Sequence, residues 1–415
     1  MAGALVAQDG GLPAARSSAQ GTSFIRRTQN TTKLAGIYLH IPFCKQACTY
    51  CNFHFSTSLR YKDEMVKAIA EELIAESDYL QGETINTVYF GGVTPSLLSP
   101  DECGLLMDTI GAHYNLSADP EVTLESNPDD ITNERAAAWK HSGINRLSIG
   151  VQSFFEEELR WMNRAHDARQ ALSGVQLALR QFDNITVDLI YGSPLLNDDM
   201  WKQNVDMATG LGIPHLSCYA LTVEEKTPLH QLIRKSNAED VDMDKQAKQF
   251  LLLMQWLREK GYEHYEVSNF AKPGFRSQHN SSYWKGEKYL GVGPSAHSFN
   301  GKERRWNAPN NNGYIRGINE RSPRRESELL TASQQLNEYI MISLRTTEGM
   351  DLKKIEMNWG VTERQRAQQQ IRGLVTRGLV EMRNDIVRLT DSGMLLADGI
   401  SADLFADAPE YAAIR

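Results

Sequence analysis

The stretch "HIPFCKQACTYCNF", residues 40–53, places three of the chain's five cysteines within one short loop. Cys44, Cys48 and Cys51 are spaced four and then three residues apart. Thiolates are soft ligands that suit zinc or iron–sulfur clusters. Three thiolates on a cubane cluster leave one iron open, and a chelating small molecule can then occupy that position. The spacing CxxxCxxC, with Tyr50 just before the last cysteine, is typical of this arrangement.

Zinc is the main alternative for these cysteines. A structural zinc site usually takes four ligands from two separated pairs, and no second Cys/His pair lies near this loop. His40 and His54 flank the cysteines, however, so zinc stays open at this point, as does a role as inert buried thiols. A colourless purified protein would favour zinc, whereas a brown one would favour an iron–sulfur cluster.

The segments that follow Gly36 alternate between β-rich runs and helical patterns. The strand candidates are residues 36–41, 85–92, 121–128, 144–154, 185–192 and 215–222. Between them, apolar residues recur at three- and four-residue spacing, as in residues 61–80. Successive β-then-α units imply a parallel sheet with right-handed crossovers. Six units are too few to close an eight-fold barrel, so the pattern predicts an α/β fold whose parallel sheet is either open or curved into a partial, TIM-like (β/α)6 barrel.

Polar residues stand at the carboxyl end of each strand candidate, where such sheets bind ligands. The first strand runs into the cysteines and the second into "GGVTPS". The others deliver Glu125 with Asn127, then Gln152, Asp188 and Tyr219. We therefore expect these side chains to meet at one rim of the barrel.

The C-terminal third has a different pattern. We assign residues 34–300 to the barrel and its C-terminal strand extension, and residues 301–330, rich in Asn, Arg and Gly, to a linker or long loop. Residues 331–415 predict a small α+β, winged-helix-like domain, with helices over 333–345 and 363–378 and a hairpin that turns around Asn384. Its candidate recognition segment is only modestly basic, which favours a packing role over DNA binding.

Composition excludes several classes of protein. The 415 residues exceed the size of a typical single core, and the formal charge of −8 argues against a generic nucleic-acid binder. No long apolar run is present. Residues 1–33 are acid-poor and lack hydrophobic periodicity, so we expect a disordered leader there. We expect a cytoplasmic protein.

A resemblance to a known family rests on "YLHIPFCKQACTYCNF" and the rim residues. The chain resembles the radical S-adenosylmethionine (SAM) group around oxygen-independent coproporphyrinogen III oxidase, and within it most resembles the HemW-type heme chaperones, from about Gly36 onward. The oxidases have a fourth cysteine where this chain has Phe53. The resemblance implies a radical SAM barrel, a 4Fe-4S cluster on Cys44, Cys48 and Cys51, and bound SAM and heme.

The resemblance also implies a SAM site. Its residues would be Tyr38, Tyr50, Gly92, Val93, Thr94, Glu125, Gln152, Arg164, Asp188 and Ala220. Glu125 would pair with the methionine ammonium, and Arg164 with its carboxylate, through charge-assisted bonds. Asp188 would bind ribose hydroxyls.

One position departs from the family pattern GGGTP, because Val93 replaces its third glycine. If that backbone needs positive φ, a β-branched residue is strained by about 1–3 kcal/mol. We therefore expect weakened but not abolished SAM binding.

"HNSSYW" at residues 279–284 matches the HNxxYW motif of the chaperone branch, where it is associated with heme. Imidazole is a common axial ligand of heme iron, and aromatic rings can cover a porphyrin face. The resemblance therefore gives His279, Asn280, Tyr283 and Trp284 as heme residues. The alternative is a loop histidine bonded to backbone, with both aromatic side chains in the core.

As a function, the resemblance implies a heme chaperone that delivers heme to apo-hemoproteins such as respiratory enzymes. An electron donor would reduce the cluster, and peripheral membrane association would arise through partners. The alternative function is coproporphyrinogen III oxidation, in which a 5′-deoxyadenosyl radical abstracts hydrogen from propionate side chains. Phe53 and "HNSSYW" argue against it.

Overall fold

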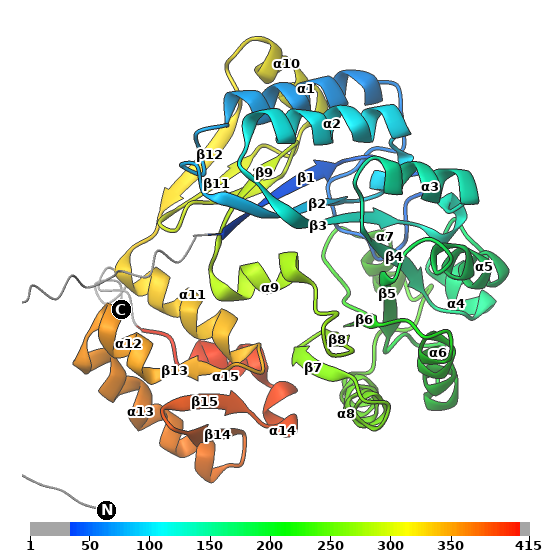
Figure 1. Ribbon diagram of the computed structural model, residues 1–415. Helices are drawn as coiled ribbons and strands as arrows, with labels where there is room; N and C mark the ends of the chain where they lie inside the picture. The colour runs from blue at the N-terminus through cyan, green and yellow to red at the C-terminus, as the bar shows by residue number, and fades with distance from the viewer. Residues whose placement is uncertain (1–33, 407–415) are drawn as a thin grey trace, which may run out of the picture. The chain divides into compact units, whose positions relative to one another are not determined.

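The computed structural model describes residues 34–406, so the expected leader over residues 1–33 lies outside the described residues. In this range twelve strands form one sheet, in the order β12-β11-β10-β9-β1-β2-β3-β4-β5-β6-β8-β7 (Figure 1). The centre of the sheet is parallel and follows chain order: β1 (Leu34–Ile41), β2 (Thr84–Gly92), β3 (Leu116–Ser126), β4 (Arg146–Gln152), β5 (Asn184–Tyr191) and β6 (His215–Ala220). The six expected strands and the partial barrel are thus confirmed.

Helices connect these strands and cover the outside of the curved sheet (Figure 1). They are α1 (Lys62–Ala75), α2 (Pro100–His113), α3 (Asn133–His141), α4 (Glu156–Trp161), α5 (Ala168–Ala178) and α6 (Asp198–Gly210), with 3-10 turns η1 (Pro95–Leu97) and η2 (Pro128–Asp130). Local sequence sets their bounds. At the start of α2, for example, the Ser99 side chain accepts a bond from the Glu102 N–H, and the Glu102 side chain accepts one from the Ser99 N–H.

Antiparallel strands extend both edges of the sheet. After α7 (Pro228–Arg234) and α8 (Met243–Glu259), β7 (Glu263–Glu266) and β8 (Asn269–Ala271) continue beyond β6. On the other side, β9 (Lys288–Val292) runs parallel to β1, and β10 (His297–Phe299), β11 (Glu303–Asn307) and β12 (Arg325–Leu329) follow it.

The expected linker over residues 301–330 is wrong. This segment forms β11, α10 (Asn311–Asn319) and β12, and it packs on the barrel. Its polar side chains serve a buried carboxylate of α1, Glu72, which pairs with Arg325 at 2.6 Å and accepts bonds from Asn307 and Tyr314. The Asn and Arg residues that suggested a loop therefore bond to a buried carboxylate instead.

The C-terminal domain has its own hydrophobic core, which includes Ile340, Leu352 and Ile371. Its elements are α11 (Ala332–Leu344), β13 (Met350–Asp351), α12 (Leu352–Trp359), α13 (Val361–Thr376), β14 (Val380–Arg383), β15 (Ile386–Leu389), α14 (Asp391–Met394) and α15 (Ala397–Asp403). The predicted hairpin is present, and both turn residues, Asn384 and Asp385, have positive φ, as a type I′ turn requires.

The motif "HNSSYW" lies on a helix, α9 (Gln278–Lys285), rather than a loop. The helix packs on the first halves of β1 and β2, within the curve of the sheet (Figure 1). Glycine at position 36 makes this approach possible, since a Cβ there would lie 2.8 Å from Thr87 Oγ1 and 3.2 Å from the His279 ring.

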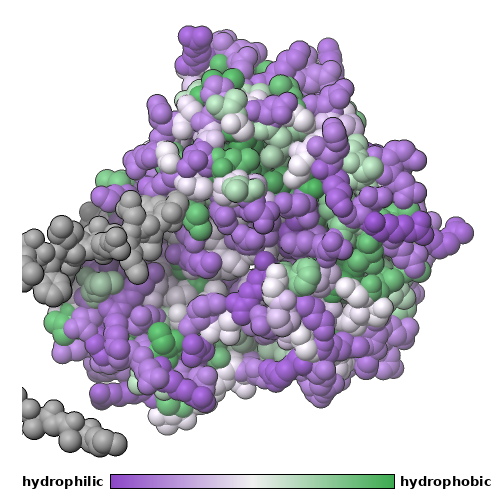
Figure 2. Space-filling model, viewed as in Figure 1, coloured by the Kyte–Doolittle hydropathy of each residue, from purple (hydrophilic) through white to green (hydrophobic). Residues whose placement is uncertain are grey.

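Hydrophilic side chains cover most of the face seen in Figure 2. Across residues 34–406, no helix combines the length and the hydropathy that crossing a bilayer demands.

Candidate functional site

A cavity of about 500 Å³ opens at the carboxyl ends of the parallel strands, and we call it the cluster cavity. It brings together every residue expected at the cluster and at SAM. These lining residues are Tyr38, Cys44, Cys48, Tyr50, Cys51, Gly92, Val93, Thr94, Glu125, Gln152, Arg164, Asp188 and Ala220. They come from β1 to β6 and the loops after them, so the rim predicted from the strand ends is the rim observed.

The cysteine loop between β1 and α1 is fastened to neighbouring turns. The Gln46 amide donates to the backbone oxygen and the side-chain oxygen of Asn163, at 3.0 and 2.9 Å. Lys45 pairs with Asp129 at 2.7 Å and also with the buried Asp130. These bonds fix the loop from both sides of the cavity.

All three thiols are free and face the same cavity. Cys44 Sγ accepts from the Thr94 hydroxyl, and Cys48 Sγ from the Arg164 guanidinium, both at 3.4 Å. Within residues 34–406 no three His, Cys, Asp or Glu side chains converge on a single ion. A cubane binds each thiolate through a different iron, so three thiols around one cavity suit a cluster better than one zinc ion.

Arg164 is half-buried and lines the cluster cavity. Its guanidinium donates to Asn127 Oδ1 at 2.6 Å and to the Gly150 carbonyl at 2.8 Å. Its Nε is buried and has no acceptor among the described residues. Because buried donors are normally satisfied, this atom suits an anionic ligand such as a carboxylate.

Two carboxylates in the cavity have no cationic partner in an ion pair among the described residues. Burial raises the pKa of Glu125 to about 7 and that of Asp188 to about 6. The Tyr89 hydroxyl donates to Glu125 at 2.9 Å, which holds the carboxylate facing the cavity. A ligand with a positive charge would restore the ionised form of Glu125, so this carboxylate suits the ammonium of SAM.

The glycine-rich turn after β2 corrects one expectation. Gly92 has a φ of 110°, and a Cβ there would lie 2.8 Å from His40 Nδ1. Val93 is not among the residues with positive φ. The strain expected at Val93 is therefore absent, because the left-handed position falls on the preceding glycine.

Comparison with known proteins identifies the family of this chain. Residues 38–208 match the Radical SAM superfamily, and residues 330–396 match the HemN C-terminal domain. The heme chaperone HemW of Mycobacterium tuberculosis (strain ATCC 25618 / H37Rv) is 34% identical over 371 residues, 88% of this chain and 93% of the relative. That of Bacillus subtilis (strain 168) is 32% identical, over 88% and 97%. The chain belongs to the HemW family of radical SAM proteins.

Solved structures agree with the fold of this HemW family member. Coproporphyrinogen III oxidase (HemN) from Escherichia coli superimposes with a TM-score of 0.78 over 90% of each chain, at 22% identity. This likeness establishes a shared fold. The family itself implies SAM and an iron–sulfur cluster, in agreement with the residues of the cluster cavity.

The HNxxYW motif of this HemW family member does not line the cluster cavity, although the His279 ring stacks on Tyr38, which does. His279 is 1% exposed, and its ring nitrogens contact Thr87 Oγ1 and the Tyr283 hydroxyl, both at 2.8 Å. Burial lowers the pKa of His279 to about 3. Both nitrogens are thus engaged within the protein, while Trp284 lines a second cavity, described below.

The two remaining cysteines and several residues near the rim have structural roles. Cys103 and Cys218 are buried in the barrel core. His166 is buried with Nε2 3.1 Å from the Val151 carbonyl. His297 stacks on Trp306 outside the cluster cavity, and Gly293 packs so closely that a Cβ would lie 2.4 Å from the His40 carbonyl oxygen.

Sequence reasoning missed the residues that support the site. Tyr89 bonds to Glu125, an expected site residue, and Lys45 fastens the cysteine loop to Asp129 and Asp130. Tyr89 is an inward position of β2, three residues before Gly92, and Lys45 lies between two cluster cysteines. The partners of Lys45, Asp129 and Asp130, lie too far along the chain to be read from a pattern.

Proposed function

We propose that this protein is a cytoplasmic heme chaperone that binds heme and delivers it to apo-hemoproteins, with respiratory enzymes as the expected recipients. The 4Fe-4S cluster would be held by Cys44, Cys48 and Cys51. The names of the HemW relatives support the role. The observation that carries the cofactor assignment is the cluster cavity, where free thiols, unpaired carboxylates and an incompletely bonded arginine meet.

Each polar group of the cavity has a distinct task toward SAM. Arg164 holds the carboxylate of the methionine part, Glu125 its ammonium, and Asp188 the ribose hydroxyls. Tyr50 accepts a bond from Arg164 at 3.3 Å and so keeps the guanidinium beside Cys48. A bound cluster, reduced by an external electron donor, would supply an electron for reductive cleavage of the sulfonium.

The first test is cluster assembly. Cys48→Ala and, as a matched control, Cys103→Ala are purified without air and reconstituted with iron and sulfide. Wild type and the control, whose thiol lies in the core, should contain iron and sulfide in similar amounts, whereas Cys48→Ala should lose them. Unchanged iron in Cys48→Ala would remove the cluster assignment.

The second test separates the chaperone from coproporphyrinogen III oxidation. The same anaerobic preparation is offered coproporphyrinogen III with SAM and reductant, and separately hemin. Retained hemin without a vinyl product supports the chaperone, in line with Phe53 at the position of the extra oxidase cysteine. A vinyl product would establish the oxidase instead.

A further inference from the structure

A second cavity, of about 410 Å³, lies at the other ends of the strands, where β1 and β2 begin. The barrel forms one side, α9 the second and the C-terminal domain the third. Among its lining residues are Ala35, Thr87, Trp284, Lys285, Tyr339 and Lys354. The volume is within the range of about 300–1,000 Å³ that is usual for small-molecule sites.

Two aromatic residues line this second cavity from different elements. Trp284 belongs to α9 and Tyr339 to α11. The Trp284 Nε1 is buried without an acceptor among the described residues, and the Arg345 guanidinium lies 5.5 Å from the ring centroid. A buried indole N–H without an acceptor is costly to the folded chain alone, so it favours a ligand that accepts a bond.

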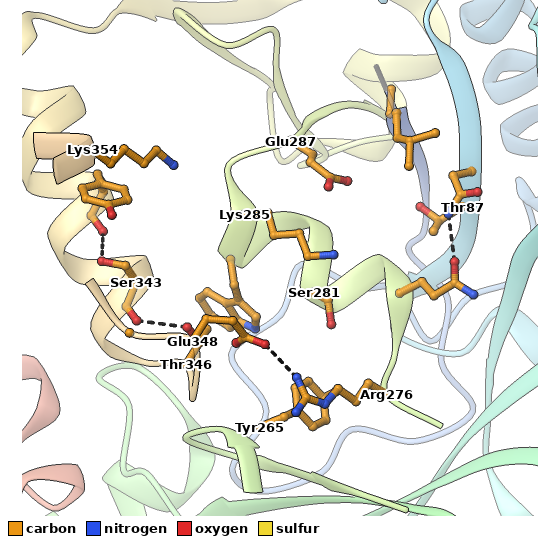
Figure 3. Close-up of a pocket in the computed structure, with 17 residues that line it drawn as sticks. Thr87, Tyr265, Arg276, Ser281, Lys285, Glu287, Ser343, Thr346, Glu348 and Lys354 are labelled. Carbon is orange, nitrogen blue, oxygen red and sulfur yellow. Dashed lines mark hydrogen bonds and ion pairs between the residues drawn. The ribbon is translucent and has the colours of Figure 1, made fainter. Parts of the chain in front are cut away.

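Of the basic residues that line the second cavity, one forms ion pairs and two do not. Arg276 is neutralised by Glu263 and Glu348, at 2.9 and 2.8 Å. Lys285 and Lys354 form no ion pair within residues 34–406. Figure 3 shows that Lys354 extends from the C-terminal domain toward the α9 side, where Lys285 and Glu287 stand.

Partial burial disfavours the charged form of two side chains in this cavity, one basic and one acidic. It lowers the pKa of Lys354, which also lies 4.5 Å from the Tyr339 centroid, and it raises the pKa of Glu287. Both shifts show that charge is poorly solvated here. A ligand carboxylate would compensate the half-buried Lys354 ammonium, and a second carboxylate would find the exposed Lys285, which has no ion pair within residues 34–406.

We propose that this second cavity binds the tetrapyrrole, with its ring against Trp284 and Tyr339 and its two carboxylates on Lys285 and Lys354. This inference rests on the proposed heme function and locates the cargo within the molecule. Binding then depends on the ring and the carboxylates, and not on His279 as an iron ligand. The site requires both α9 and the C-terminal domain.

The test titrates hemin and iron-free protoporphyrin IX into the full chain, followed by Soret absorbance. Lys285→Glu and Lys354→Glu reverse one charge each. Lys353→Glu is the matched control, because Lys353 is the exposed neighbour of Lys354 and does not line the cavity. Ser281→Trp fills the cavity without changing its charge. Unfolding midpoints and SAM binding report whether each variant is folded.

We expect wild type and Lys353→Glu to bind both pigments alike. Each charge reversal should weaken both pigments by about tenfold, the loss of one charge-assisted bond, and Ser281→Trp should weaken them further. Equal affinity for hemin in all folded variants would overturn this site. Binding of hemin without binding of protoporphyrin IX would also overturn it. Neither result would contradict the chaperone function. No hemin binding by wild type would overturn the proposed function itself.

Discussion

Glu125 is a buried carboxylate whose bond from Tyr89 keeps it facing the cluster cavity. Its proton competes with any ligand cation, because burial raises the pKa of Glu125 to about 7 and the charge of Asp188 adds to that rise. Below pH 7 the carboxyl is therefore largely neutral. A cationic ligand binds the ionised form better, so it must displace the proton.

SAM affinity should accordingly depend on pH. We expect it to rise as pH increases from 5.5 to 7, with a limiting slope of about tenfold per unit below the pKa. Glu125→Gln should bind SAM more weakly and with a flatter profile. Equilibrium titration of reconstituted protein measures both. A slope that persists in Glu125→Gln would assign the titration to another group, with Asp188 the nearest alternative.

The turn at Gly92 and Val93 gives a contrasting pair of substitutions. Since Val93 is not left-handed, Val93→Gly should not improve SAM affinity through relief of strain. Gly92→Ala should weaken SAM binding, because alanine at a φ of 110° is strained by about 1–2 kcal/mol and its Cβ would meet His40. Isothermal titration of both variants with SAM measures the two affinities. A clear gain in SAM affinity in Val93→Gly would show that Val93 is strained after all.

At the scale of elements, Glu72 on α1 holds the sheet extension in place. It pairs with Arg325 of β12 and also accepts from Asn307 and the Gly293 N–H, each at 2.8 Å. Arg325 also pairs with Glu76, so Glu72 and Glu76 share this one guanidinium. Glu72 therefore fastens α10, β11 and β12 to the barrel.

Glu72→Gln should lower the free energy of unfolding by about 1–3 kcal/mol, because Arg325 keeps its pair with Glu76, and it should speed hydrogen exchange in β11 and β12. Its exposed neighbour provides the control, since Glu71→Gln should change neither. Urea unfolding and exchange measured by mass spectrometry give the two results. Similar midpoints for both variants would contradict the assigned role of Glu72.

The helix α9 is fixed at its start by a second buried carboxylate. Glu121 accepts from the N–H groups of Gln278 and His279, at 3.0 and 2.9 Å. His279 then bonds to Thr87 and Tyr283. The motif thus positions α9 against the barrel, so that Trp284 and Lys285 reach the second cavity.

His279→Ala should therefore act mainly on stability, by about 2–4 kcal/mol from the cavity and two unsatisfied hydroxyls. Any hemin that the folded variant binds should keep the wild-type Soret position. Asn280→Ala is the neighbouring control. A stable His279→Ala protein with a shifted Soret band would instead make His279 an iron ligand.

Much of this architecture was predictable, for a physical reason. In the parallel strands the buried runs and the polar residues after them are local features of sequence, so Glu125, Gln152 and Asp188 could be assigned to one rim. The segment 301–330 and the Lys45 pairs could not, because their partners lie far along the chain. The same applies to the second cavity, which exists only where residues 330–406 dock on α9.

At the scale of the whole molecule, the two cavities lie at opposite ends of the same strands and share none of their lining residues. If hemin occupies the second cavity, protein loaded with hemin should still bind SAM. We expect equal amounts of SAM bound at saturation with and without hemin, measured by equilibrium dialysis on reconstituted protein. Mutually exclusive binding would mean that both ligands compete for the cluster cavity.

Strand β1 reaches from one cavity to the other, since Ala35 lines the second and Tyr38 the first. It is paired on both sides, with β2 and β9, in fixed register. Such a ribbon cannot slide without breaking two ladders of backbone bonds at once. A signal that passes between the cargo and the metal centre would therefore travel through rotating side chains or a swinging C-terminal domain, and the barrel would act as the stationary frame for both.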